Sequence, residues 1–173
     1  AHAMTLAIQD TTFLNYTHHP QTEGLGSIGK KELQQRGFGL HTTCAVTPQG
    51  QPLGVLTQQY FERPIGEPSH TPARAQQLPI EEKESYRWIE AFQKTIERTP
   101  EGVQVVTVCD REGDFYEMFA LAQERQADLL VRANADRRLD EEVKSLWAKA
   151  ESQKTVGALT VGIIGNDKRQ ARQ

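Results

Sequence analysis

The sequence has 173 residues, the length of one domain of ordinary size that can bury a core of its own. Its 37% hydrophobic and 25% charged residues are typical of a globular protein and exclude a disordered chain. No apolar run approaches the roughly 20 residues of a membrane-spanning helix, and the net charge of -3 gives no sign of a generally basic surface. We therefore expect a cytoplasmic protein without a signal peptide or a membrane anchor.

The first part of the chain predicts three strands. Residues 1–4, AHAM, resemble a tag remnant and are left out of the fold prediction. Residues 6–14 predict a short strand, and the aperiodic stretch 15–37 predicts a loop. Residues 37–47 and 53–61 are typical of strands, and PQGQP between them is typical of a turn. We therefore predict an antiparallel hairpin here.

The rest of the chain alternates helix and strand. Residues 62–79 hold four of the eight prolines and predict an extended connection. Residues 81–99 place Trp88 and Phe92 on one apolar stripe of a helix, and the apolar run 103–109 is typical of a strand buried on both faces. Further helices are predicted at 114–125 and 139–152, and further strands at 127–133 and 155–165.

This order of elements predicts an α/β fold with a mixed sheet. Strands 1-3 are antiparallel, alternating helices and parallel strands follow, and helices cover both faces. Right-handed crossovers place the strand that ends at Cys109 beside the strand that ends at Asp10. The order is that of the ribonuclease H-like fold, in which the end of the fourth strand lies next to the middle of the first.

That topology brings Asp10 and Asp110 to one rim of the sheet. Two carboxylates that lie close together repel each other unless a cation lies between them. With no Cys or His at ligand spacing, their oxygens suit Mg²⁺ or Mn²⁺, ions that support phosphodiester chemistry. Turn roles fit the same residues, since Asp110 in DREGD suits a helix N-cap and Asp10 in QDTT suits an Asx-turn. The residues by themselves leave both interpretations open.

Other reactive residues have structural explanations. Cys44 and Cys109 lie in apolar runs, and we expect buried free thiols. Glu112 and Asp114 are expected to form the turn and to cap the helix that follows. We expect the histidines His18, His19 and His41 to be structural or exposed. We expect both tryptophans, Trp88 and Trp147, to lie in the core and not to stack on bases.

Five blocks of the sequence resemble the catalytic core of bacterial insertion-sequence transposases. They are IQDTTFLNYTHHPQTEGLGSIG, GLHTTCAVTPQGQPLGVLTQQYFERP, EEKESYRWIEAF, VVTVCDREGDFYEMF and DLLVRANADRR. They run from about Leu6 to about Arg138, in the order of the family and near its spacing. The group is the cut-and-paste DDE transposases related to the enzyme of transposon five. The DTT block, the EKES helix start and the CDREGD block are specific in combination.

The resemblance implies that Asp10 and Asp110 are the first two members of a catalytic triad that holds Mg²⁺ or Mn²⁺. The third member in this family is a glutamate in a Tyr-Arg-Glu-Lys signature beyond a β-strand insertion, and no glutamate of this sequence matches it. Residues 5–154 would be part of the ribonuclease H-like catalytic core, and 155–173 would begin the insertion. We therefore expect a fragment of a transposase that is inactive by itself.

The resemblance also implies double-stranded DNA, as transposon ends and target, for the partner. The expected reactions of the parent protein are hydrolysis at transposon ends, hairpin formation and strand transfer, carried out by a dimer on DNA in the bacterial cytoplasm, associated with the nucleoid. Arg132, which follows a strand on the rim of the aspartates, is the first candidate for DNA contact. Further candidates for phosphate contacts are Arg137, Arg138, Lys30 and Lys31.

Alternatives remain for these assignments. A solvated loop, balanced by neighbouring aspartates, explains Arg137 and Arg138 equally well. The chain as a whole also fits a non-catalytic fragment that binds DNA or the full-length transposase, or a stand-alone ribonuclease H-like nuclease.

Overall fold

The computed structural model describes residues 4–29, 34–65, 77–139 and 145–160. By its internal contacts the chain divides into two compact units, Ala1–Asn134 and Ala135–Gln173. Each unit is described by itself.

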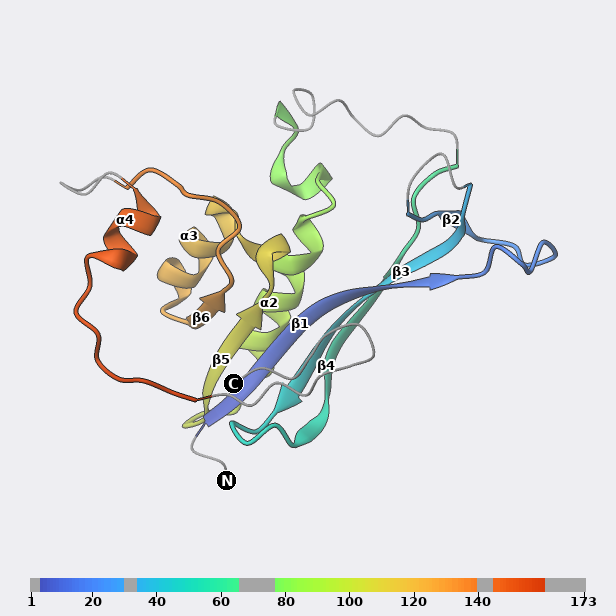
Figure 1. The fold of residues 1–173 in the computed structure, drawn as a ribbon. Coiled ribbons are helices and arrows are strands. Elements are labelled where there is room, and N and C mark those ends of the chain that lie inside the picture. The colour runs from blue at the N-terminus through green and yellow to red at the C-terminus, as the bar shows by residue number, and fades with distance from the viewer. Residues whose placement is uncertain (1–3, 30–33, 66–76, 140–144, 161–173) are drawn as a thin grey trace. The chain divides into compact units, whose positions relative to one another are not determined.

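The first unit contains a mixed sheet of six strands (Figure 1). In chain order they are β1 (Met4–Asn15), β2 (Gly26–Ser27), β3 (Arg36–Val46), β4 (Pro52–Phe61), β5 (Gln104–Cys109) and β6 (Asp128–Val131). Their order across the sheet is β2-β3-β1-β5-β6, and β4 also pairs with β3. The β1–β3 and β3–β4 pairs are antiparallel, whereas β1–β5 and β5–β6 are parallel. The predicted α/β class and hairpin are confirmed, and β2 is an addition that the aperiodic stretch did not predict.

The helix α2 (Tyr86–Arg98) is shorter than the predicted helix at 81–99. A 3-10 turn, η2 (Ile80–Glu82), comes first, and Lys83 after it has the extended backbone angles φ -87° and ψ 146°. An extended residue cannot continue a helix, so α2 begins beyond it.

The helix α3 (Tyr116–Arg125) follows a separate 3-10 turn, η3 (Arg111–Gly113). Asp114, the predicted cap of this helix, has the non-helical angles φ -85° and ψ 69°, and the N-cap position belongs to Phe115. The prediction that Asp114 caps the helix is therefore wrong. Its carboxylate instead accepts a hydrogen bond from the backbone N–H of Asn134 at 2.5 Å, which joins the turn after β5 to the segment after β6.

Both helices pack on the same face of the sheet. Trp88 and Phe92 of α2 form one buried cluster with Met118 and Leu121 of α3 and Cys109 of β5. The chain runs from β4 through α2 to β5 and from β5 through α3 to β6, in the same direction across the sheet each time. Two right-handed crossovers in one direction leave both helices on one side. The described residues of this unit therefore do not contain the predicted helix layer on the second face.

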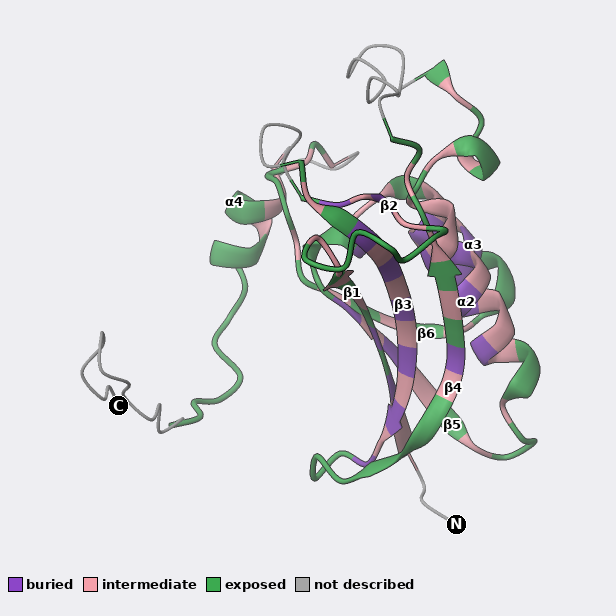
Figure 2. Cartoon of the chain, turned by 90° about the vertical axis from the view of Figure 1, so that its right-hand side faces the viewer, coloured by how far each residue is buried: buried purple, intermediate pink, exposed green. Residues whose placement is uncertain are grey.

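The two faces of the sheet differ in burial, as strand alternation requires. Odd-numbered residues of β3 from 37 to 45 are buried beneath the helices, and even-numbered ones from 38 to 46 are half-buried on the opposite side (Figure 2). We call the side with the buried odd-numbered residues of β3 the helical face. The opposite side is the even face, and it carries Ile8, Asp10, Cys44 and Val108 at paired or alternating positions.

The second unit contains the short helix α4 (Leu146–Glu151) within its described residues. The hydroxyl of Ser145 caps this helix, and its backbone forms an isolated β-bridge with Arg138. Bridge geometry at Ser145 is incompatible with helix, so the predicted helix at 139–152 begins later, at Leu146. Residues 140–144 lie outside the described residues.

Two predictions about the second unit are wrong. Residues 155–160 form no strand, because alternation produces a strand only where a neighbour pairs with it; the rest of the predicted strand, 161–165, lies outside the described residues. Trp147 is 43% exposed and not in the core, since α4 has only six residues and buries none of them.

Across the described residues, none of the helices has both the length and the apolar composition required to cross a membrane.

Candidate functional site

Asp10 and Asp110 each come directly after one of two residues that are paired across parallel strands. Gln9 of β1 pairs with Cys109 of β5, and each aspartate is the next residue in its chain. Neighbouring strands lie about 4.8 Å apart, so the backbones at the two aspartates are adjacent. Both aspartates are exposed. The structure therefore brings these two positions together although 100 residues separate them.

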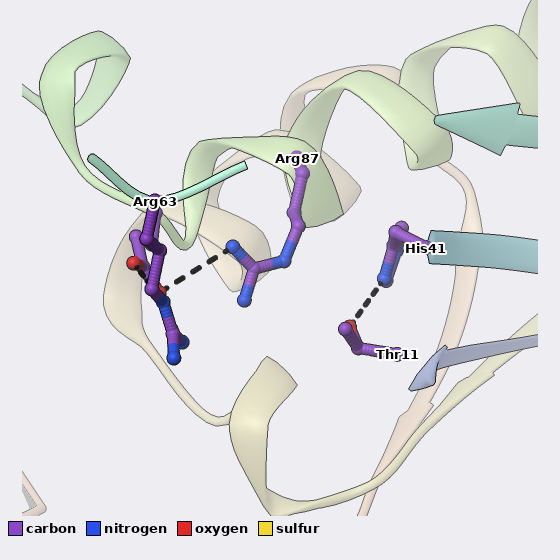
Figure 3. Close-up of polar contacts among 5 residues, drawn as sticks. Thr11, His41, Arg63 and Arg87 are labelled. Carbon is purple, nitrogen blue, oxygen red and sulfur yellow. Dashed lines mark hydrogen bonds and ion pairs between the residues drawn. The ribbon is translucent and has the colours of Figure 1, made fainter. Parts of the chain in front are cut away.

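The flanking residues of Asp10 hold it on the even face. Gln9 and Thr11 point to the helical face, where both contact the buried ring of His41. Thr11 Oγ1 lies 2.8 Å from Nδ1 (Figure 3), and Gln9 Oε1 lies 3.3 Å from Nε2. The ring also packs edge-on against Trp88, with centroids 4.5 Å apart. Since side chains alternate along a strand, anchoring both neighbours turns Asp10 to the other side.

This buried environment keeps the His41 ring neutral. Burial, with a smaller effect from the charge of Arg87, lowers the pKa of His41 to about 4. A neutral imidazole has one donor and one acceptor nitrogen, which matches contacts with a hydroxyl and an amide. The structural role predicted for His41 is confirmed by its complete burial.

Asp110 is held by the turn that it begins. Its carboxylate Oδ1 accepts a hydrogen bond from the backbone N–H of Glu112 at 2.8 Å and caps η3. The turn role that the residues left open is therefore correct for Asp110. Such a cap occupies one carboxylate oxygen, so it is compatible with a ligand on the other.

Close packing beneath the turn requires glycine at position 113. A Cβ on Gly113 would lie 2.6 Å from Cβ of Cys109 and 3.6 Å from the ring of Trp88. The turn therefore rests directly on the core, and the position of Asp110 depends on that contact. Burial, with a smaller effect from the negative charge of Asp110, raises the pKa of the Cys109 thiol to about 12. As predicted, Cys109 is a buried free thiol, while Cys44 is a half-buried one.

A cavity of about 660 Å³ opens beside Asp110. It lies between the start of α2, the turn after β5 and the segment after β6, and its lining residues are Ser85, Arg87, Trp88, Asp110, Arg111, Glu112, Asp114, Phe115 and Asn134. Asp10 is not among the described residues that line it. The cavity is polar and carries both signs of charge, so it suits a ligand with charged groups.

Arg87 is the most enclosed cation of this cavity. Its guanidinium stacks 4.3 Å from the ring centre of Phe61 and pairs with Glu84 at 3.7 Å. Glu84 in turn accepts two hydrogen bonds from Arg63, at 2.6 Å from Nε and 2.8 Å from Nη2 (Figure 3). Arg63 lies over the ring of Phe13 at 4.8 Å. The ion-pair cluster Arg63–Glu84–Arg87 thus joins the end of β4 to the start of α2.

Glu84 is ionised in this cluster. Burial opposes the charge of the carboxylate, but the hydrogen bonds and charges of Arg63 and Arg87 outweigh it and lower its pKa. Burial of Arg87 lowers the pKa of its guanidinium, against the attraction of Glu84 and Glu112. A partly desolvated arginine beside a cavity is a strong anion-binding group when a ligand enters.

Arg132 lies on the same rim as the two aspartates. Cys109 pairs with Val131 of β6, and the backbone N–H of Arg132 donates to the Cys109 carbonyl at 3.1 Å. Gln9, Cys109 and Val131 therefore form one row across β1, β5 and β6. Arg132 comes directly after Val131, and it is exposed. The rim thus carries Asp10 on β1, Asp110 directly after β5 and Arg132 directly after β6.

The structure does not test the other predicted DNA contacts as part of this rim. Arg137 and Arg138 belong to the second unit, where Arg138 forms the bridge with Ser145 and the carbonyl of Arg137 accepts a hydrogen bond from the backbone N–H of Leu146. Lys30 and Lys31 lie outside the described residues. Their predicted role in binding phosphate stays a prediction.

Among the described residues, Asp10 and Asp110 are the candidate metal ligands of this rim. No group of three or more His, Cys, Asp and Glu side chains with metal-binding geometry occurs in the ranges that the structure describes. Asp10 and Asp110 carry exposed carboxylates, the type of donor that an oxygen-preferring ion uses. His18, His19 and His41 do not form a transition-metal site within these ranges.

Known proteins provide no assignment. No protein-family model and no curated protein matches the sequence.

Arg87 and Ser85 are residues of the cavity that sequence reasoning did not select. Both residues belong to the EKESYRW block, which contributes to the family resemblance but to which no role was assigned. In the structure, the ring of Phe61 and the carboxylate of Glu84 hold Arg87 beside the cavity, and both contacts come from residues that helix periodicity does not include.

Proposed function

We propose that this chain is part of the catalytic core of a cut-and-paste DDE transposase with a ribonuclease H-like sheet. Asp10 and Asp110 supply two of its metal-binding carboxylates. The observation that carries the proposal is the register of β1 and β5, in which Gln9 lies beside Cys109 and the aspartates follow together. The resemblance of the sequence blocks to this family supports it.

The donor chemistry fits Mg²⁺ or Mn²⁺. Both ions prefer oxygen ligands and keep several waters, so two carboxylates and the substrate phosphate would complete much of a coordination sphere. When bound, such an ion supplies Lewis-acid activation of the attacking oxygen and neutralises charge on the leaving oxygen.

The contribution of the protein is positional. Asp10 is held on the even face because Gln9 and Thr11 are anchored to His41. Asp110 is held by its bond to Glu112 N–H. A site on strands and a tight turn keeps its ligands in place better than a site on long loops does.

Double-stranded DNA is the proposed substrate. Arg132 lies on the rim beside the aspartates and would contact phosphates near the cleaved bond. Contacts by Arg137, Arg138, Lys30 and Lys31 would add sequence-independent affinity. In the parent protein, which would act as a dimer on DNA, this site would cleave transposon ends and join them to the target.

The chain by itself is proposed to be inactive in strand transfer. Its 173 residues contain no match to the third acidic residue of the family, and an incomplete ligand set holds metal weakly. Detectable strand transfer by the purified chain would contradict this part of the proposal.

A non-catalytic DNA-binding fragment is the second candidate. One observation favours it: the described ranges contain no group of three or more metal-ligand side chains. This candidate predicts DNA binding that is indifferent to metal and to both aspartates.

Binding of Mn²⁺ tests the two candidates, with paramagnetic resonance as the readout. We expect the wild-type chain to bind Mn²⁺, and Asp10→Asn and Asp110→Asn each to weaken it by about tenfold or more. The matched control is Asp128→Asn, an exposed aspartate at the far end of β6, which bonds to Gln104. Equal Mn²⁺ affinity in all four proteins would remove the metal site and leave the non-catalytic candidate.

A further inference from the structure

Three aromatic rings form a row across the strands at one end of the sheet. The rings of Tyr16 and Phe38 are stacked, with centroids 5.7 Å apart and planes 18° apart. The ring of Tyr60 lies 4.8 Å from Phe38 at 51°. We call Tyr16, Phe38 and Tyr60 the aromatic row.

The aromatic row shares the even face with Asp10. Phe38 pairs with Leu14 of β1, and Tyr60 pairs with Leu40 of β3. Paired residues lie on one face, and Leu14 is four residues along β1 from Asp10, so their side chains point to the same side. At about 3.4 Å per residue, the row begins about 14 Å from Asp10 along the strand.

One end of the row is exposed and has a cation near it. Tyr60 lies on β4 and is 56% exposed, whereas Tyr16 and Phe38 are half-buried. Arg36, exposed, stands two residues before Phe38 on β3 and therefore on the same face. The backbone of Arg36 is fixed by bonds with Tyr16 N–H at 2.8 Å and Thr17 Oγ1 at 3.0 Å. One acidic group is also near, since the Tyr60 hydroxyl donates to Glu62 at 3.4 Å.

On the helical face at this end of the sheet, aromatic rings contact arginine side chains of the protein. Phe13 and Phe61 meet edge-to-face with centroids 6.0 Å apart, and the guanidinium groups of Arg63 and Arg87 lie over them. Those rings therefore have protein cations as partners. The helices α2 and α3 lie on the helical face, so neither covers the aromatic row.

We propose that the aromatic row is a stacking platform for unpaired bases of a DNA strand that passes Asp10. Aromatic side chains stack on the flat faces of bases, which an unpaired strand exposes and a continuous duplex does not. An arginine beside the rings adds phosphate attraction without reading sequence. From its distance along the strand to Asp10, the platform would hold unpaired bases a few nucleotides from the reacting phosphate. That position rests on the proposed function, whereas the stacking itself does not.

Strand binding by the purified chain tests the platform, measured by fluorescence anisotropy in EDTA. A labelled oligothymidylate is compared with an abasic strand of equal length, which keeps the phosphates and lacks the bases. We expect the strand with bases to bind about tenfold more tightly. Equal affinity for the two strands would overturn the proposal, as would equally tight binding of a blunt duplex.

Three variants test whether the aromatic row causes the preference for strands with bases. Tyr60→Ala should remove most of the preference for bases, and Tyr60→Phe should keep it because the ring remains. Tyr116→Ala, a change at an 81% exposed tyrosine of α3, is the matched control and should keep it too. Equal loss in Tyr60→Ala and Tyr116→Ala, or displacement of the strand by an oligosaccharide at equal concentration, would contradict the assignment.

The result of the strand-binding experiment can be distinguished from the result of the Mn²⁺ experiment. Strand binding is measured without metal, so its failure leaves a positive Mn²⁺ result standing. Conversely, absence of Mn²⁺ binding with an intact preference for bases would reject the catalytic proposal and keep the platform. If Tyr60→Ala does not fold, the comparison of normal and abasic strands on the wild-type chain still decides.

Discussion

Gln9 of β1 and Cys109 of β5 are paired in parallel register, and their side chains lie on the helical face. This single pairing places Asp10 beside Asp110 at the rim of the sheet. Both partners are buried, at 2% and 4% exposure. A slip of one residue would move every side chain of a strand to the opposite face, so burial of Gln9 and Cys109 keeps the two aspartates together.

Gly113→Ala should destabilise the first unit and disturb Asp110. The added methyl group would collide with Cβ of Cys109 at 2.6 Å, and overpacking of this kind costs about 1–3 kcal/mol. Urea denaturation measures the free energy of unfolding. Gly157→Ala is the control, because nothing lies within 4 Å of a Cβ there. Equal stability of the two variants would show that the turn does not rest on the core.

Stability should fall with acid because of His41. Burial, and then the charge of Arg87, lowers its pKa from 6.5 to about 4. Unfolded His41 takes up a proton near pH 6.5 and the folded ring only near pH 4, so its contribution is complete above pH 6.5 and is lost as the pH falls through this window. The loss is about 3 kcal/mol.

Chemical denaturation at several pH values from above 6.5 down to about 4 measures this effect. His41→Gln should show a shallower decrease in unfolding free energy than the wild type. His18→Gln, at an exposed histidine of the same unit, should keep the full decrease. An unchanged pH dependence in His41→Gln would contradict the assignment to this ring.

The thiol of Cys109 should resist alkylation in the folded protein. Burial, and then the charge of Asp110, raises its pKa from 9.0 to about 12, so the reactive thiolate is about 1,000-fold scarcer than in the unfolded chain. Iodoacetamide labelling of the Cys44→Ser variant, followed by mass spectrometry with and without urea, isolates this thiol. Rapid labelling without urea would show that the core behind Asp110 opens.

Arg132→Ala should weaken binding of duplex DNA and lower its salt dependence. Loss of one phosphate contact reduces the slope of log affinity against log salt by about 1. Arg125→Ala removes an exposed arginine at the end of α3 and is the control. The proposed DNA contact at the rim would be rejected by identical salt slopes in the two variants.

Local sequence patterns predicted the element types well where periodicity was strong. The strands around Ile8 and Cys44, the hairpin, and the helix with Trp88 and Phe92 were all expected from alternation or from an apolar stripe. Predictions failed at element ends, as with Asp114, whose carboxylate bonds to Asn134 in a distant segment. Residues far apart in the sequence compete for such side chains, and no local pattern records that competition.

The sequence by itself determined most strands and helices of the first unit, because side-chain periodicity is a local property of the backbone. It also contained both aspartates and the aromatic residues without indicating how they are grouped. Only the tertiary structure decided that Phe38 lies between Tyr16 and Tyr60, that Arg87 turns toward the cavity, and that both helices share one face. Those outcomes depend on strand register and crossover direction, which arise from hydrogen bonds and packing between segments distant in the chain.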